Sequence, residues 1–412
     1  MSVIGRRTLL KGTIAAGAAS ILAMPALGAQ EGTVRIGFVG PLSGAQQIVG
    51  QPILIGAQVA VEQANAAGSD RTFELVLRDD KGDPSQTVAN VRELVGSGTN
   101  FVVGAPLTAT AVAVAGIAAD LGIVYVAAGM GDERIAHELF SPNVFTALET
   151  NYARAHAFAD VMARTRPATR VWVPIIPDIS VGHASWLRAA SGLKKYYGRA
   201  GIEVTLLEPV VAKYGSTDFK NQIVSLMSTE ATGLYSVLFG QDGITFFTQA
   251  LTFKLADKFD VIGEQALDID LAKALGPRVP PNISSLSVWY PGAHHDNPES
   301  NALVEAFQAR TGTVPPGLTA AGHTAVKAVV EGIAKAGSIA VDEVIDAMAG
   351  MEFDTVKGRN RIRKEDHQFV TSTDLINFAA DDSQAGWSVA GYETTLTEPL
   401  LYEAAPGKPL EL

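Results

Sequence analysis

The residues from 101 to 131 constrain the fold of this chain most, because they alternate between apolar runs and turns of small residues. Residues 101–103 and 123–126 have the composition of buried strands, and the Ala- and Val-rich run between them is typical of a helix. A small-residue turn follows each strand, at 104–108 and at 127–131. The segment therefore predicts a βαβ unit with two bare backbone turns at the same sheet edge.

The same alternation continues along most of the chain and predicts an α/β fold. Strand and helix patterns alternate from Val34 to about residue 148, which indicates a mostly parallel, doubly wound sheet. A second alternating series from Asn151 to Gly263 indicates that this architecture is built twice. We expect the chain to return to the first lobe through a strand at 284–290, and to cross between the lobes once more after Met351.

Residues 1–29 have the layout of an export signal and are not expected to belong to the fold. Arg6 and Arg7 precede Leu-Leu-Lys and an apolar run that ends near Leu27, which resembles a twin-arginine signal. An uncleaved membrane anchor is the alternative, but the apolar run is short for a span and no lipobox cysteine follows it. We therefore expect export of an already folded protein to the periplasm.

Charge and cysteine content exclude several functions. The formal net charge is −11, and removing Arg6, Arg7 and Lys11 with the signal takes it to −14. This charge argues against nucleic acid and anionic membrane surfaces as partners. The chain has no cysteine, so disulfides, thiolate metal sites and a cysteine nucleophile are excluded.

The two turns in the organising segment predict an anion site. Thr108 stands where it can cap the following helix, so its hydroxyl and the first free N–H groups of that helix would face the crevice at the strand ends. A carboxylate is the simplest ligand for such a helix start. The alternative is that Thr108 is only a cap and that the glycines only make turns.

Several runs together resemble the type I periplasmic solute-binding proteins of ABC importers, in the leucine/isoleucine/valine-binding group. The matching runs are 36–44, 56–68, 79–84, 178–182, 217–219 and 358–368. The resemblance implies two lobes joined by three crossovers, with closure around a ligand that is delivered to membrane permease subunits. The expected first lobe comprises residues 30–149 and about 286–355, and the second comprises 150–285 and about 356–412.

The resemblance also implies ligand-binding positions. In the first lobe they fall on Leu107, Thr108, Gly129, Met130 and Gly131, where the family binds the ligand carboxylate. The family's aromatic positions fall on Val49, Val181 and Asp242, and the acid that holds an α-ammonium group falls on Glu264 or Gln265. Lost aromatic walls enlarge the pocket unless Phe239, Trp289 or Tyr290 refill it.

The leading expectation is a non-catalytic periplasmic binding protein for a small carboxylate-bearing solute, an amino acid above all, with no cofactor. An aromatic carboxylate or an amide or urea-like solute is the alternative ligand, and a ligand sensor for a membrane receptor is an alternative role. A metal-dependent hydrolase is the alternative from another class. It would use the run His294-His295-Asp296, with His183 and His323 as distant partners.

Overall fold

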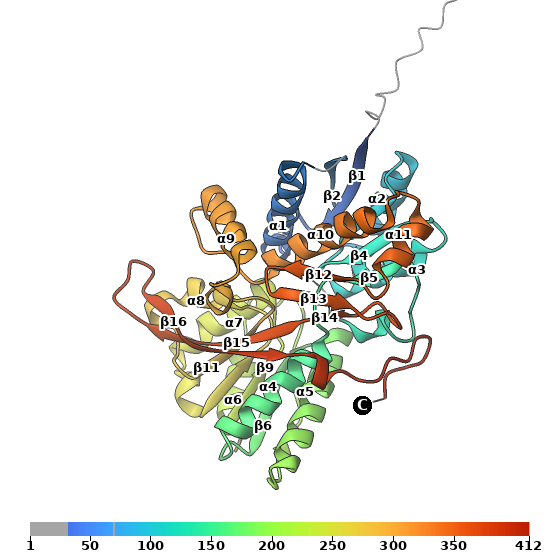
Figure 1. Cartoon of the computed structure of the whole chain (residues 1–412). Helices are drawn as coiled ribbons and strands as arrows, with labels where there is room; N and C mark the ends of the chain where they lie inside the picture. The colour runs from blue at the N-terminus through green and yellow to red at the C-terminus, as the bar shows by residue number, and fades with distance from the viewer. Residues whose placement is uncertain (1–31, 69–70, 130, 412) are drawn as a thin grey trace, which may run out of the picture.

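The computed structural model describes residues 32–68, 71–129 and 131–411. The expected export signal and Met130 lie outside these residues. The described chain forms two α/β lobes (Figure 1). No described helix is long and apolar enough to cross a bilayer.

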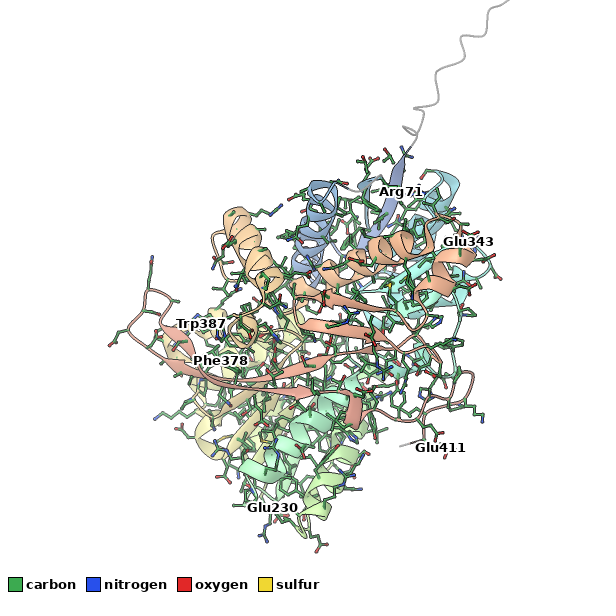
Figure 2. All side chains as sticks on the ribbon, viewed as in Figure 1. Arg71, Glu230, Glu343, Phe378, Trp387 and Glu411 are labelled. Atoms are coloured by element: carbon green, nitrogen blue, oxygen red, sulfur yellow. The ribbon has the colours of Figure 1, made fainter. Side chains whose placement is uncertain are left out.

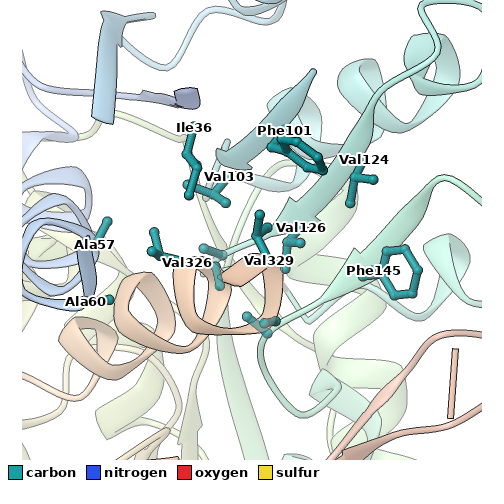
Figure 3. Close-up of a cluster of buried hydrophobic side chains, with 14 of the residues drawn as sticks. Ile36, Ala57, Ala60, Phe101, Val103, Val124, Val126, Phe145, Val326 and Val329 are labelled. Atoms are coloured by element: carbon teal, nitrogen blue, oxygen red, sulfur yellow. The ribbon is translucent and has the colours of Figure 1, made fainter. Parts of the chain in front are cut away.

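The first lobe is built on a five-stranded parallel sheet in the order β2-β1-β3-β4-β5. Alternate strand residues pack on opposite faces, so Val103 meets α1, α10 and α11 while Val102 meets α2 and α3. Figure 3 shows the first of these clusters, with Ile36, Val126 and Val329 directed at one another. The elements are β1 (Thr33–Gly40), α1 (Gln47–Ala66), β2 (Thr72–Asp79), α2 (Pro84–Gly96), β3 (Phe101–Gly104), α3 (Thr108–Ala118), β4 (Val124–Ala127), β5 (Val144–Thr146), α10 (Leu318–Ala336) and α11 (Val341–Met348).

Two glycines allow α1 and α10 to cross in direct backbone contact. A Cβ atom at Gly56 would lie 1.9 Å from the backbone oxygen of Thr319, and one at Gly322 would lie 1.8 Å from that of Ile53. No side chain fits into either space. The close crossing places both helices under the strands that carry the candidate turns.

The second lobe is built on an eight-stranded mixed sheet in the order β16-β15-β11-β10-β9-β6-β7, with β8 also paired to β6. Helices α4 and α5 cover one face, and α6, α7 and α8 cover the other. The elements are α4 (Asn151–Thr165), β6 (Val171–Pro177), α5 (Ser180–Arg199), β7 (Thr205–Leu206), β8 (Val210–Ala212), α6 (Lys220–Met227), β9 (Gly233–Ser236), α7 (Gly240–Thr252), β10 (Val261–Glu264), α8 (Ile269–Leu275), β11 (Ile283–Ser287), β15 (Ser372–Ala380) and β16 (Trp387–Leu396).

The antiparallel hairpin of β15 and β16 forms one side of this sheet. Trp387 packs edge-on against Phe378 at the tip of the hairpin, with ring centroids 6.1 Å apart (Figure 2). The expected return to the first lobe through a strand at 284–290 is wrong. β11 pairs with β10 and β15 of the second sheet, and the chain leaves this lobe only after Ser287.

The described chain crosses between the lobes near Glu149, after Ser287 and near Thr371, and the segment after the second of these crossovers adds to the first lobe. Helix α9 (Pro298–Thr311) packs on α1, and a small sheet of β12 (Glu352–Thr355), β13 (Gly358–Ile362) and β14 (Phe369–Val370) follows α11. Ile362 and Phe369 are buried in the first lobe's core. We had expected residues from 356 onwards to belong to the second lobe. Residues 356–370 pack with the first lobe instead, because their apolar side chains are buried there.

Candidate functional site

The two bare turns lie side by side at the carboxyl edge of the first sheet. Gly104 of β3 pairs with Ala127 of β4, and the N–H of Ala128 donates to the Gly104 oxygen at 3.0 Å. Gly104 and Gly129 have φ values of +109° and +110°, which side chains rarely tolerate. The turns therefore present backbone at neighbouring positions.

Thr108 is not the helix cap that the sequence predicts. Leu107 occupies the N-cap position with an extended backbone, and Thr108 is the first residue of α3. No side chain caps the start of this helix. The first N–H groups of α3 thus lack intrahelical partners at the edge where the half-buried Thr108 stands.

The second turn is packed against the first and against the crossover into the second lobe. A Cβ atom at Gly129 would lie 2.7 Å from Cβ of Pro106, so the two turns are in contact. The oxygen of Gly131 accepts a hydrogen bond from the N–H of Asn151 at 2.7 Å. This bond ties the turn directly to the start of α4 in the second lobe.

Glu264 serves its own loop and is not free to hold a ligand's ammonium group as the resemblance implied. Its Oε1 accepts hydrogen bonds from the N–H groups of Ala266 and Leu267 at 2.6 and 2.8 Å, and its Oε2 accepts one from the Ser285 hydroxyl at 2.5 Å. The side chain is fully buried, and that burial raises the pKa of the carboxyl.

Gln265 is also engaged inside the second lobe. Its Oε1 accepts from the Tyr235 hydroxyl at 3.0 Å, and its Nε2 donates to the Ser185 hydroxyl at 3.4 Å. Its backbone oxygen accepts from Arg154 at 2.6 Å. Sequence reasoning could not anticipate these partners, because they lie on three other elements.

Asp242, in the first turn of α7, anchors the loop that follows β8. Its Oδ2 accepts a hydrogen bond from the N–H of Gly215 at 2.7 Å, and burial raises the pKa of the carboxyl. The anchored loop carries Tyr214, whose ring lies 5.7 Å from that of Phe239. Asp242 thus positions an aromatic pair that the sequence analysis had only half identified.

Tyr214 also bridges the two lobes. Nε2 of Gln46, just before α1, donates to the Tyr214 hydroxyl at 2.7 Å. Both Gln46 and Leu107 lie next to Gly82, where a Cβ atom would be 3.8 Å from the Gln46 side chain and 2.9 Å from that of Leu107. The aromatic pair therefore stands opposite the Leu107 turn across the boundary between the lobes.

The remaining expected site residues are more dispersed. Val181 lies in the first turn of α5, and Val49 lies on α1, partly buried against the first lobe's core. Tyr290 donates its N–H to Asp374 at 2.8 Å and packs its ring 5.6 Å from that of Tyr392 on the edge strand β16. Its ring thus contacts the sheet edge.

A buried ion pair between the lobes had no signal in the sequence. Glu133 lies in the short helix η1 (Glu133–Ile135) after the second turn, and it pairs with Arg188 of α5. The Glu133 carboxylate also accepts the N–H of Tyr152. Burial raises the pKa of Glu133, while the charge of Arg188 opposes that shift.

The four histidines of the hydrolase alternative each have a separate hydrogen-bond partner. Nε2 of His294 lies 3.1 Å from Asp374, and Nδ1 of His295 lies 3.0 Å from the Gly292 oxygen. His183 lies 3.4 Å from Asp178. His323 is bonded to Gln63, and burial lowers its pKa to about 3. Within the described residues, no three His, Cys, Asp or Glu side chains are grouped so that they could hold a metal ion.

Two pockets on the described surface lie away from the turns. One lies between α7 and residues 275–282, and the other lies between the start of α9 and the β12–β13 turn. Neither is lined by residues of the two turns, so the candidate site rests on the turns and on the side chains that face them.

Two α/β lobes joined by three crossovers, with bare turns of one facing the other, define the bilobal class of solute-binding proteins. The model of the periplasmic binding protein family matches residues 33–383, and the chain belongs to this family. The leucine-, isoleucine-, valine-, threonine- and alanine-binding protein of Pseudomonas aeruginosa is 26% identical over 79% of this chain and 84% of its own length. The Leu/Ile/Val-binding protein homolog 2 of Brucella abortus is 26% identical over 76% of this chain and 82% of its own length.

Solved structures show the same fold. An amino acid ABC transporter substrate-binding protein from Pseudomonas fluorescens superposes with a TM-score of 0.77, at 22% identity, over 88% of this chain and 96% of its own. A solute-binding protein from R. palustris in complex with benzoate superposes with a TM-score of 0.75, at 20% identity, over 92% of this chain and 100% of its own. These relatives and neighbours are solute-binding proteins, and this chain is a solute-binding protein and not an enzyme.

Proposed function

We propose that this chain is the periplasmic solute-binding subunit of an ABC importer and that it captures a small carboxylate between its lobes. The observation that carries the proposal is the pair of adjoining turns after β3 and β4, where Gly104 and Gly129 offer backbone in place of side chains. Free N–H groups at the start of α3 favour a negatively charged ligand group, and Thr108 adds a hydroxyl donor.

Lobe closure is the proposed mechanism. A ligand that contacts both lobes binds the closed arrangement more tightly than the open one, so its binding free energy shifts the population towards closure. The Gln46–Tyr214 bond supports this view, because it joins the rims of the two lobes beside Leu107. The closed complex would then deliver the solute to permease subunits in the inner membrane.

An amino acid is the first ligand class that we propose. The curated relatives are named for leucine, isoleucine and valine, at 26% identity over most of the chain. Asp242 is the acid that remains to hold an α-ammonium group, since it is only partly buried. A charge-assisted bond from this carboxylate would contribute about 1.5–3 kcal/mol.

An aromatic carboxylate is the second candidate, and the partners of Glu264 favour it. Both carboxylate oxygens of Glu264 already accept hydrogen bonds, from the N–H groups of its own loop and from the Ser285 hydroxyl. Glu264 therefore has no free acceptor for an ammonium group. The ring pair of Tyr214 and Phe239 supplies an apolar wall opposite Leu107. The neighbour from R. palustris holds benzoate, which agrees with this candidate.

A thermal-shift screen distinguishes the ligand classes. Free amino acids, benzoate and hydroxybenzoates, and small amides are each added to the purified protein, because a tight ligand raises the melting temperature by mass action. Stabilisation by amino acids alone removes the aromatic candidate, and stabilisation by aromatic acids alone removes the amino acid. No stabilisation by any carboxylate contradicts the proposal.

Variants of Thr108 then test the site with the ligand so identified. Thr108→Val keeps the shape but removes the donor, and it should weaken binding by about 1–3 kcal/mol. Thr108→Ser is the control and should restore most of the affinity. Equal affinity in all three proteins would remove Thr108 from the site. Uptake into vesicles that contain the partner permease separates an importer subunit from a sensor.

A further inference from the structure

The last residues of the chain cross from the second lobe back to the first, in addition to the three crossovers. We call residues 397–408, which follow β16, the C-terminal strap. It begins at the third crossover, where the N–H of Thr397 donates to the Thr371 oxygen at 2.9 Å and the N–H of Thr371 donates to the Thr397 hydroxyl at 3.2 Å. Figure 1 shows the strap in dark red between β16 and the marked C-terminus.

The strap is anchored in the second lobe by its short helix η5 (Glu398–Leu400). This helix contacts α4, and Leu400 is buried in the core that α4 and α5 share. Two residues later, the ring of Tyr402 lies 5.4 Å from that of Tyr152 on α4. The first half of the strap therefore packs on the second lobe, while Glu398 also accepts a hydrogen bond from Arg361 of β13 in the first lobe at 2.6 Å.

The other half is anchored in the first lobe, at His137 in the loop between η1 and β5. The N–H of Gly407 donates to the His137 oxygen at 2.7 Å, and Nδ1 of His137 lies 3.2 Å from the Lys408 oxygen. Arg363, which follows β13, donates to the backbone oxygen of Tyr402 at 3.0 Å. The far end of the strap thus moves with the first lobe.

The ring of Tyr402 contacts both lobes. Its ring contacts His137 of the first lobe, with centroids 4.4 Å apart, and Tyr152 of the second lobe. Its hydroxyl is buried without a hydrogen-bond partner among the described residues. The ring, not the hydroxyl, is therefore what this position contributes.

We propose that the C-terminal strap is a fourth tether between the lobes and that it stabilises their closed arrangement. The ring contacts of Tyr402 with His137 and Tyr152 are made in the same arrangement of the lobes in which Gln46 reaches Tyr214. Opening the lobes separates these rings, so each opening costs the contacts of the strap. A protein without the strap populates the open arrangement more.

Two variants test the proposal by small-angle X-ray scattering of the protein without ligand. Tyr402→Ala removes the ring, and Tyr402→Phe is the matched control that keeps it. The Ala variant should have a larger radius of gyration than the wild type, and the Phe variant should not. Truncation after Leu401 should act like Tyr402→Ala, whereas truncation after Lys408, beyond the strap, should not.

Affinity gives a second measure, which rests on the proposed binding function. With the ligand found in the screen, Tyr402→Ala should weaken binding about 2- to 10-fold, because less of the protein is in the binding-competent state. An unchanged radius of gyration in the Ala variant overturns the proposal, whatever its affinity. If no carboxylate binds the wild type, the proposed function fails, while scattering still decides on the strap.

Discussion

Lys357 and Glu149 form a buried ion pair, 3.1 Å from Nζ to Oε2, at the point where the three crossovers converge. Lys357 lies in the turn between β12 and β13, and Glu149 lies in the first crossover. The same ammonium group also donates to the oxygen of Val288 in the second crossover, at 2.7 Å, and to that of Ser372 at the third. One side chain therefore holds all three connections between the lobes.

Lys357→Met should lower the free energy of unfolding by about 3 kcal/mol, at the low end of the range for a broken buried ion pair, because the fully buried Glu149 keeps only the longer contact to Arg154 at 3.7 Å. Urea unfolding measures this loss. Lys220→Met is the control, because Lys220 pairs with Asp218 in solvent and should contribute less than about 1 kcal/mol. Equal losses in the two variants would show that Lys357 does not hold the crossovers.

Gln46→Ala should weaken ligand binding about 2- to 12-fold, the equivalent of one net hydrogen bond. The bond from Gln46 to Tyr214 exists only while the rims of the lobes touch, so its loss favours the open arrangement. Titration calorimetry measures the change. Gln241→Ala, on the exposed start of α7, is the matched control and should bind as the wild type does. Wild-type affinity in Gln46→Ala would exclude this bond from closure.

The sequence predicted the strands and turns that depend on residues close together in the chain. It did not predict contacts between elements that are distant in the chain. The alternation at 101–131 predicts two adjoining turns, and β3 and β4 do place Gly104 and Gly129 at one edge. Strand periodicity and glycine are local signals, so one segment was enough to predict them. The strand expected at 284–290 was assigned to the first lobe, whereas β11 belongs to the second sheet. The sequence could not show this, because an apolar run does not indicate which sheet it joins.

The second lobe's part of the site could not be predicted in the same way. An acid at position 264 has the right chemistry for an ammonium group, but Ser285 and the N–H groups of its own loop already occupy its oxygens. Tyr214 had no special pattern in the sequence, and its place opposite Gln46 depends on how the lobes meet. Tertiary packing, not composition, decides which polar groups remain free.

Gly322→Ala should destabilise the protein by about 1–3 kcal/mol or more, because its Cβ would lie 1.8 Å from the Ile53 oxygen and would force α1 and α10 apart. Gly116→Ala is the matched control on the exposed face of α3, where nothing lies within 4 Å of the added atom. It should stabilise the protein by about 0.5–1 kcal/mol through helix propensity. Urea unfolding compares the two, and similar values for both would contradict the close crossing.

Asp268 joins the second lobe to the first and should make stability depend on pH. Asp268 follows β10 in the second lobe. Its Oδ2 accepts a hydrogen bond from the N–H of Gly317, just before α10, at 2.6 Å, and another from the Ser287 hydroxyl at 2.9 Å. Burial raises the pKa of this carboxyl from 3.8 to about 7, and the nearby Asp270 adds to the shift.

Between pH 4 and 7 the unfolded chain loses the proton of Asp268, while the folded protein keeps it. The unfolded state then binds fewer protons, so this group's contribution to stability is present below pH 4, falls as the pH rises, and is lost above about pH 7. Asp268→Asn is neutral at every pH. Its stability relative to the wild type should therefore increase from pH 4.5 to pH 7.5 in urea unfolding.

Asp268 is not the only carboxyl in this part of the structure whose pKa is raised by burial. Burial also raises the pKa of Glu264 and Asp270, and Asp270 interacts with Asp268, so the difference between wild type and variant reports Asp268 together with its coupling to Asp270. A difference for Asp268→Asn that does not change from pH 4.5 to pH 7.5 would mean that Asp268 is already ionised in the folded protein, and that the bond to Gly317 is made by a charged carboxylate.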